Sequence, residues 1–179
     1  MEARRSALVT GAARGIGRAI AERLAADGIG VSVADLPSSK DEVDAVVAGL
    51  GANGAALGLS VDVADAASVE AVVAAHVEHF GGLDVMVANA GIAVTAPLLE
   101  TTAEQWQLTM DVNLKGVLHC YQSAARQMIA QGRGGRLIAA ASVAAHRGGK
   151  WQGAYSASKF GVRGLTQSVA QELAPYQIT

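Results

Sequence analysis

The chain has 179 residues, of which 51% are hydrophobic and 17% are charged, and its formal net charge is -2. This length and composition suit one domain with a filled core and exclude an intrinsically disordered protein. The densest basic run is Arg4-Arg5, too short for a nucleic-acid-binding surface. No signal-peptide core and no apolar stretch of the ~20 residues that span a bilayer is found, so a soluble cytoplasmic protein is expected.

Strands and helices alternate along the sequence. A strand over residues 7–10 leads to a helix over 15–27, a strand over 31–34 to a helix over 40–50, and a strand over 55–61 to a helix over 66–80. A strand over 84–88 precedes a helical segment over 102–131 in two pieces, and a strand over 136–141 precedes a helix over 155–174. This order predicts a doubly wound α/β fold, a parallel sheet with helices on both faces, in one domain over 1–179.

The single cysteine, Cys120, excludes an internal disulfide. It stands in an apolar stretch of the helical segment predicted over 102–131. A buried, unreactive thiol is therefore expected there.

A glycine-rich segment joins the first predicted strand to the first helix. Gly11, Gly15 and Gly17 stand in it. Glycines at such a junction permit a sharp turn and a close approach of the backbone to a pyrophosphate, and the N-terminus of the following helix attracts the anion. Because a strand precedes the segment and a helix follows it, a dinucleotide site is favoured over an ordinary tight turn.

Asp35 ends the second predicted strand, about 20 residues after the glycines. A carboxylate at this place binds the hydroxyls of the adenosine ribose and repels a 2′-phosphate, which favours NAD over NADP. Two alternatives stay open. Asp35 could serve only to open a turn before Pro37, and Arg14 could attract a 2′-phosphate and so favour NADP.

Four polar residues suit proton transfer. Tyr155 and Lys159 are spaced i, i+4 at the start of the last predicted helix, so they share one face, where the ammonium can stabilise a phenolate. Ser142 follows the fifth predicted strand, at the carboxyl edge of the sheet where ligands bind, and its hydroxyl can bond a substrate oxygen. Asn113 falls within a predicted helix, where asparagine is unfavourable, which indicates a specific hydrogen bond.

These residues resemble, in order and spacing, the motifs of the short-chain dehydrogenase/reductase family. The motifs are Thr10-Gly11, Gly15-Ile16-Gly17, Asn89-Ala90-Gly91, Asn113, Ser142 and Tyr155-Ser156-Ala157-Ser158-Lys159. The resemblance implies that Tyr155 is the acid/base and that Lys159 activates it and holds the nicotinamide ribose. It also implies that Ser142 orients the substrate carbonyl and that Asn113 holds a water of the proton relay.

The same resemblance implies a set of cofactor-binding residues, namely Gly11, Arg14, Gly15, Ile16, Gly17, Asp35, Asp62, Val63, Asn89, Ala90, Gly91, Tyr155 and Lys159. Within this set Asp62 and Val63 would flank the adenine, and Asn89 to Gly91 would line the cleft. The sequence departs from the family mildly at Ala88, where an asparagine is usual.

The sequence also stops as residues 177–179 begin what reads as another strand. Family members usually continue into further strands and a substrate lid. A protein of these 179 residues alone is therefore expected to be insoluble or inactive.

More than one class of substrate agrees with the sequence. Residues 158–167 resemble acetoin/diacetyl reductases and 2,3-butanediol dehydrogenases, and Gln152, in the loop before Tyr155, could bond the second oxygen of a vicinal diketone. A solvated loop residue is an equal interpretation of Gln152. Reduction of 3-oxoacyl groups, or oxidation of sugars or steroids, remains open.

Two other classes of protein compete with these enzymes. One is a non-catalytic NAD-binding regulator on the same fold, against which the complete Ser142, Tyr155 and Lys159 set argues. The other is a metalloenzyme, but His76 and His79 lack a third ligand and are expected on an exposed helix face. The resemblance further implies a homotetramer or homodimer, with the segments 102–131 and 155–174 shared between subunits.

Overall fold

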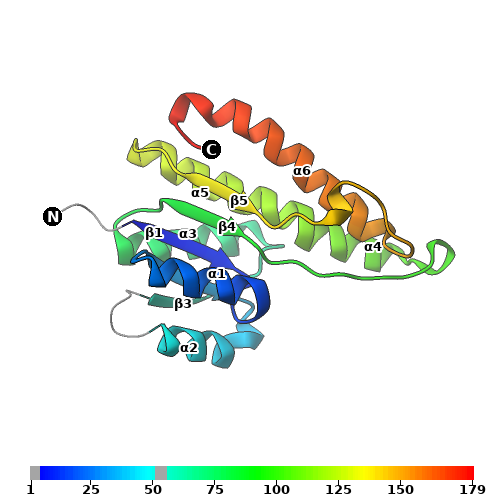
Figure 1. Ribbon diagram of the computed structural model, residues 1–179, viewed down its shortest axis with the longest axis horizontal. Coiled ribbons are helices and arrows are strands. Elements are labelled where there is room, and N and C mark those ends of the chain that lie inside the picture. Colours follow the sequence, from blue (N-terminus) through cyan, green and yellow to red (C-terminus); the bar gives the residue numbers. More distant parts are fainter. Residues whose placement is uncertain (1–4, 51–55) are drawn as a thin grey trace.

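The computed structural model describes residues 5–50 and 56–179. It contains a single sheet of parallel strands in the order β3-β2-β1-β4-β5 (Figure 1). The strands are β1 (Ser6–Thr10), β2 (Gly30–Asp35), β3 (Ala56–Ser60), β4 (Val85–Ala88) and β5 (Arg136–Ala139). The chain order reverses direction across the sheet between β1 and β4, which places a ligand-binding crevice at the carboxyl ends of these strands.

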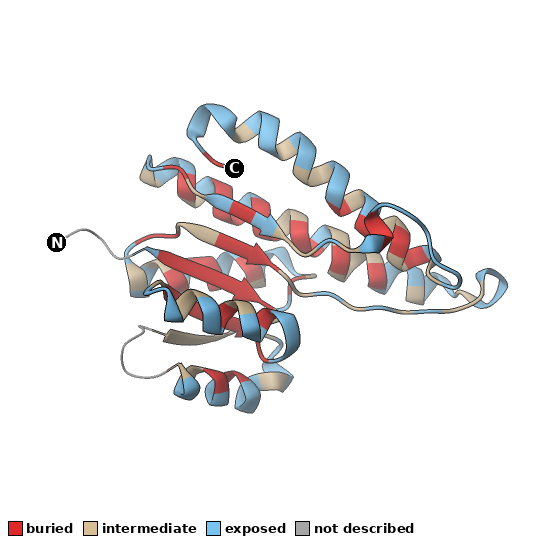
Figure 2. Cartoon of the chain, viewed as in Figure 1, coloured by how far each residue is buried: buried red, intermediate tan, exposed pale blue. Residues whose placement is uncertain are grey.

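Within the described residues, six α-helices alternate with or follow the strands and cover both faces of the sheet. They are α1 (Gly15–Ala26), α2 (Lys40–Gly49), α3 (Ala66–Phe80), α4 (Ala103–Met110), α5 (Gly116–Gln131) and α6 (Gly153–Leu173). Side chains of α1 and α2 pack with Val9 and Val31 on one face, and those of α3, α5 and α6 pack with Leu8 and Met86 on the other. The predicted doubly wound fold is confirmed, and Figure 2 shows the buried residues gathered in the sheet and on the inner sides of the helices.

Alternate residues of β1 enter opposite core clusters, as a sheet covered on both faces requires. β5 differs because it lies at the edge of the sheet, and Ile138 is 49% exposed. At this edge the last described residues begin a parallel pairing, in which Ile178 lies opposite Gly135 and Leu137 donates its N–H to the carbonyl of Thr179. The predicted strand entry over 177–179 is present in this form.

The element boundaries differ from the prediction by a few residues. The last helix begins at Gly153, before Tyr155, and β5 ends at Ala139 instead of residue 141. The long helical segment is divided into α4 and α5 by a π-helical turn over Asp111–Lys115, which agrees with two pieces. The predicted start of the third strand, at residue 55, lies outside the described residues.

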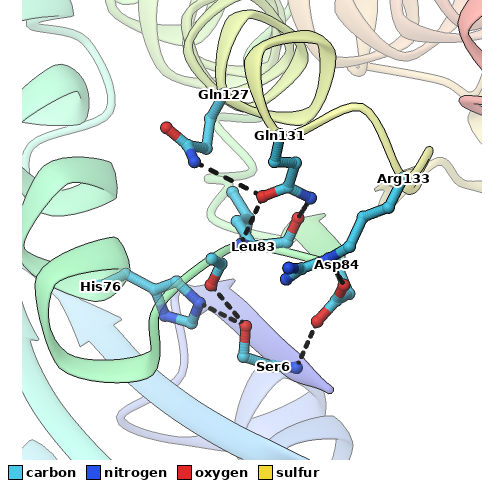
Figure 3. A network of polar contacts seen from close by, with 8 residues as sticks. Ser6, His76, Leu83, Asp84, Gln127, Gln131 and Arg133 are labelled. Atoms are coloured by element: carbon cyan, nitrogen blue, oxygen red, sulfur yellow. Dashed lines mark hydrogen bonds and ion pairs between the residues drawn. The ribbon is translucent and has the colours of Figure 1, made fainter. Parts of the chain in front are cut away.

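The expectation that His76 lies on an exposed face is wrong, although His79 is exposed. α3 packs directly on the sheet, and position 76 faces inward, where His76 bonds the hydroxyl of Ser32 at 2.7 Å. It also bonds the hydroxyl of Ser6 at 3.0 Å (Figure 3). Among the described residues, no group of histidines, cysteines and carboxylates is arranged to hold a metal ion.

The single thiol lies inside the helical layer of α3, α5 and α6. Cys120 is fully buried, as predicted, and burial raises the pKa of its thiol to about 12. No helix in residues 5–50 or 56–179 is long and apolar enough to cross a bilayer.

Candidate active site

The glycine loop between β1 and α1 has a backbone that fits a closely bound anion. Gly11 and Gly15 have φ angles of +65° and +58°, which side chains rarely adopt. A Cβ at Gly17 would overlap the carbonyl oxygen of Gly11, so the helix can start this close to the loop only with glycine there. No side chain caps α1 at Arg14, and Ile16 is 74% exposed beside the loop. The first N–H groups of α1 are thus open to a phosphate.

Asp35 lies beside this loop at the end of β2. Its carboxylate accepts hydrogen bonds from the backbone N–H of Ala13 at 2.9 Å and of Leu36 at 2.8 Å. Each bond uses one carboxylate oxygen, so both oxygens keep a free lone pair for a ribose hydroxyl. The structure therefore brings Asp35 and the glycine loop together, as the sequence predicts for a dinucleotide site.

The segment after β3 is held by α5. The carbonyl of Val63 accepts a hydrogen bond from His119 Nδ1 at 2.9 Å, so this ring nitrogen carries the hydrogen. A Cβ at Gly116 would lie 2.8 Å from Val63 Cγ2, which shows how closely the segment packs on the helix. Asp62 turns its carboxylate to the N–H of Ala64 at 2.9 Å. Sequence reasoning missed His119 and Gly116, because both contacts exist only once α5 lies across the segment.

Asn89 fastens β4 to the glycine loop. Its amide nitrogen donates to the carbonyls of Thr10 at 3.0 Å and Gly11 at 3.1 Å. The hydroxyl of Thr10 in turn accepts the N–H groups of Asn89 at 3.1 Å and Ala90 at 3.2 Å. Thr10 is part of the glycine motif, but its contact with Asn89 and Ala90 becomes visible only once β1 pairs in parallel with β4.

Asn113 is fully buried in the π-helical turn between α4 and α5. Its Oδ1 accepts the N–H of Ile92 at 2.8 Å, and its Nδ2 donates to the carbonyl of Ile92 at 2.8 Å and to Ser158 Oγ at 3.1 Å. The predicted specific hydrogen bond is confirmed. Asn113 joins the loop after β4 to α6, and a π-helical turn at such a place is frequent at functional sites.

Lys159 lies next to this junction and is 4% exposed. Its ammonium donates to the carbonyl of Ala140 at 2.8 Å and lies 5.8 Å from the centre of the Tyr155 ring. A Cβ at Gly91 would lie 3.2 Å from Asn113 Oδ1 and 3.6 Å from Lys159 Nζ, so the loop after β4 passes directly over both groups. Burial lowers the pKa of Lys159.

Ser142 and Tyr155 complete the site at the carboxyl end of β5. Ser142 Oγ accepts the N–H of Ala144 at 3.1 Å, which leaves its own hydrogen available to a ligand. Tyr155 is half-buried in the first turn of α6, and no hydrogen bond to its hydroxyl is found within residues 5–50 and 56–179. Its phenol is thus available to a ligand in the crevice.

Gln152 stands just before α6. Its side chain folds back on its own loop, where a Cβ at Gly149 would overlap Oε1. This placement directs the amide toward Gly149. A contact between Gln152 and a substrate stays a prediction.

Comparison with known proteins agrees with this geometry. A profile of the family described as short chain dehydrogenase matches residues 5–179, and the chain belongs to this family. It is 48% identical to a short-chain dehydrogenase/reductase of Hericium erinaceus over all of this chain and 72% of that protein. It is 45% identical to L-2,3-butanediol dehydrogenase of Corynebacterium glutamicum, covering 94% of this chain and 66% of that one.

Two further comparisons bear on substrate and fold. The chain is 44% identical to the 3-oxoacyl-[acyl-carrier-protein] reductase of Staphylococcus aureus, over all of this chain and 72% of that protein. The crystal structure of a short-chain type dehydrogenase/reductase from Mycobacterium marinum superposes with a TM-score of 0.91 at 37% identity, covering 97% of this chain and 71% of that one. The chain thus spans roughly 66–72% of the length of these relatives.

Proposed function

We propose that this chain holds the cofactor and catalytic part of an NAD-dependent oxidoreductase that interconverts an alcohol and a carbonyl compound. The observation that carries the proposal is the buried ammonium of Lys159, which lies beside Tyr155 and bonds only a neutral carbonyl among the described residues. Burying a cation without a counter-ion costs free energy. A functional site, where the ammonium stabilises a phenolate, accounts for that cost.

Tyr155, Ser142 and Lys159 each have a separate role in this proposal. When bound, NAD(H) supplies the ring that gives up or accepts the hydride. In the direction of reduction, Tyr155 would transfer its phenolic proton to the carbonyl oxygen of the substrate. Ser142 donates its free hydrogen to the same oxygen and holds it toward Tyr155. Lys159 has two further ammonium hydrogens, enough to hold the ribose hydroxyls while it stabilises the phenolate.

Asn113 holds the loop after β4 against α6, beside Lys159. Both of its amide hydrogens are taken by Ile92 and Ser158. A water of the proton relay would therefore use the second lone pair of its Oδ1. In this proposal Asn113 positions the relay and takes no proton itself.

The proposed cofactor is NAD, because the carboxylate of Asp35 lies at the edge of the glycine loop and would repel a 2′-phosphate. Reduction of one carbonyl substrate with NADH and with NADPH tests this proposal. Higher kcat/KM with NADH is expected. A clear preference for NADPH would indicate that Arg14 binds a 2′-phosphate, and it would contradict the proposed role of Asp35 in selecting NAD.

The substrate is proposed as a small carbonyl compound of the acetoin/diacetyl type, supported by the similarity to L-2,3-butanediol dehydrogenase. The 44% identity to a 3-oxoacyl-[acyl-carrier-protein] reductase supports a 3-oxoacyl compound as the second candidate. A panel of diacetyl, acetoin, a 3-oxoacyl thioester and a cyclic ketone, followed by NADH absorbance on the full-length protein, separates them. Activity with none of these, together with no NADH binding, would contradict the proposed function.

We also propose that the protein forms a homodimer or homotetramer in the cytoplasm. Trp106 and Leu108 of α4 and Phe160 of α6 are each exposed by 44–53%, and contact with another subunit would cover these apolar side chains. Light scattering on the purified protein tests the assembly. A monodisperse monomer would contradict it.

A further inference from the structure

The part of the chain that carries the catalytic residues has an uneven charge distribution. Residues 112–171 contain no aspartate or glutamate, although the whole chain has 16 of these residues and a net charge of only -2. The basic residues in this stretch are Lys115, Arg126, Arg133, Arg136, Arg147, Lys150, Lys159 and Arg163. These basic residues are spread out and form no basic run. The excess of positive charge arises because the stretch contains no acidic residue.

Most of these cations are engaged elsewhere. Three form ion pairs with carboxylates, and three others donate to main-chain carbonyls. Arg147 and Lys150 are the exceptions, since neither side chain has a hydrogen bond or ion pair within residues 5–50 and 56–179. Both are exposed. Their charge is therefore not neutralised within the described part of the protein.

Both residues lie in the loop between Ser142 and Tyr155. Figure 1 shows this loop beside the long loop after β4, at the end of the molecule where the strands terminate. The backbone confirms the contact, because the N–H of Ala96 donates to the carbonyl of Trp151 at 3.0 Å. The two cations are thus part of the segment that connects Ser142 with Tyr155.

The loop has a defined shape. Trp151 has a φ of +64°, a strained conformation for an aromatic residue, and the contact with Ala96 holds it there. Arg163 donates to the carbonyl of Ala145 at 3.5 Å and lies 3.3 Å from His146 Nδ1, which fastens the other end of the loop to α6. Backbone strain of this kind is found most often at functional sites.

The strained turn presents an aromatic ring together with a cation. Lys150 Nζ lies 4.6 Å from the centre of the Trp151 ring, within cation–π distance, and the ring is 56% exposed. A flat apolar surface with an adjacent positive charge matches a ligand that has an apolar part and an anionic end.

We infer that the loop of residues 146–151 is a selectivity element for substrates whose carbonyl lies near a carboxylate or phosphate, with Arg147 and Lys150 attracting the anion and Trp151 packing against the adjoining carbon chain. This inference rests on the proposed oxidoreductase function. It favours an anionic carbonyl compound over a neutral diketone within that function.

The test compares a charged and an uncharged substrate with the same 3-oxo group, acetoacetate and its methyl ester. For the Arg147→Ala/Lys150→Ala variant we expect kcat/KM with acetoacetate to fall about threefold to tenfold, mainly through KM, with methyl acetoacetate changed less than about twofold. The difference should shrink in high salt because the two cations are exposed. The control is Arg126→Ala/Arg136→Ala, which removes two positive charges that lie outside the loop. This variant should leave kcat/KM with both substrates unchanged.

Equal losses with both substrates, no loss with either, or the same loss in the control would overturn the inference. A binding measurement separates this failure from failure of the oxidoreductase proposal. Trp106→Phe leaves Trp151 as the remaining tryptophan of the two in the chain, so its fluorescence reports on the loop. Saturable quenching by acetoacetate but not by methyl acetoacetate would support the inference even without turnover, and an equal response to both would reject it.

Discussion

The buried histidine of α3 predicts how the stability of the protein depends on pH. Ser6 donates its hydroxyl hydrogen to the carbonyl of Gly82 at 2.6 Å, so it accepts from His76 Nε2–H (Figure 3). Ser32 then donates to the unprotonated Nδ1 of His76. A second proton would place a positive charge in this closed site. Burial accordingly lowers the pKa of His76 to about 4.

The sign and size of the effect follow from the two pKa values. An unfolded histidine takes up a proton near pH 6.5, whereas the folded His76 does so only near pH 4, so the unfolded state binds more protons in between. Stability is therefore lost as the pH falls from about 6.5 to 4. The loss from this residue is about 2 kcal/mol between pH 7 and pH 5, and about 3 kcal/mol by pH 4.

Urea unfolding at a series of pH values measures this effect. The His76→Phe variant should lose about 1–3 kcal/mol at pH 7, because the hydroxyl of Ser32 loses its acceptor, and its stability should then fall less steeply toward pH 5 than that of the original protein. His79→Gln is the matched control, since His79 is exposed on the same helix. An equally steep pH dependence in His76→Phe would refute the reasoning.

Three further changes test the cofactor site. Gly17→Ala should destabilise the protein by about 1–3 kcal/mol, because its Cβ would overlap Gly11, whereas Gly164→Ala, with open space around it, should be neutral or stabilising in thermal unfolding. Asp35→Ser should raise the NADPH-to-NADH ratio of kcat/KM about tenfold, and an unchanged ratio would contradict the assigned role. His119→Phe, which frees the segment after β3, should raise KM for the cofactor severalfold with kcat unchanged; a fall in kcat alone would argue against a positioning role.

The fold could be predicted because its local signals agree with one another. Apolar runs, helical spacing and glycine stops all indicate the same alternation, and the doubly wound sheet contains each predicted strand with small shifts at its ends. Tyr155 and Lys159 were predictable as a pair because an i, i+4 spacing fixes their shared face from sequence alone. The glycine loop and Asp35 were predictable because their meeting depends only on the pairing of β1 with β2.

The features that escaped prediction depend on packing between distant segments. His76 looked like a surface residue, because nothing in its neighbourhood shows that Ser6 and Ser32 face it from β1 and β2. His119 and Gly116 acquire a role only where α5 crosses the segment after β3. Likewise, that Arg147 and Lys150 lack an anionic partner among the described residues becomes visible only when the partners of the other cations in residues 112–171 are known.

The most direct test of the central claim is the Tyr155→Phe variant of the full-length protein, assayed for carbonyl reduction with NADH and for NADH binding. Loss of the phenolic proton should lower kcat by roughly 100-fold to 10,000-fold while NADH binding changes less than about threefold. Tyr176→Phe, a change of the same kind at an exposed residue outside the site, should leave both unchanged. A Tyr155→Phe variant that reduces the substrate at the rate of the original protein would contradict the account.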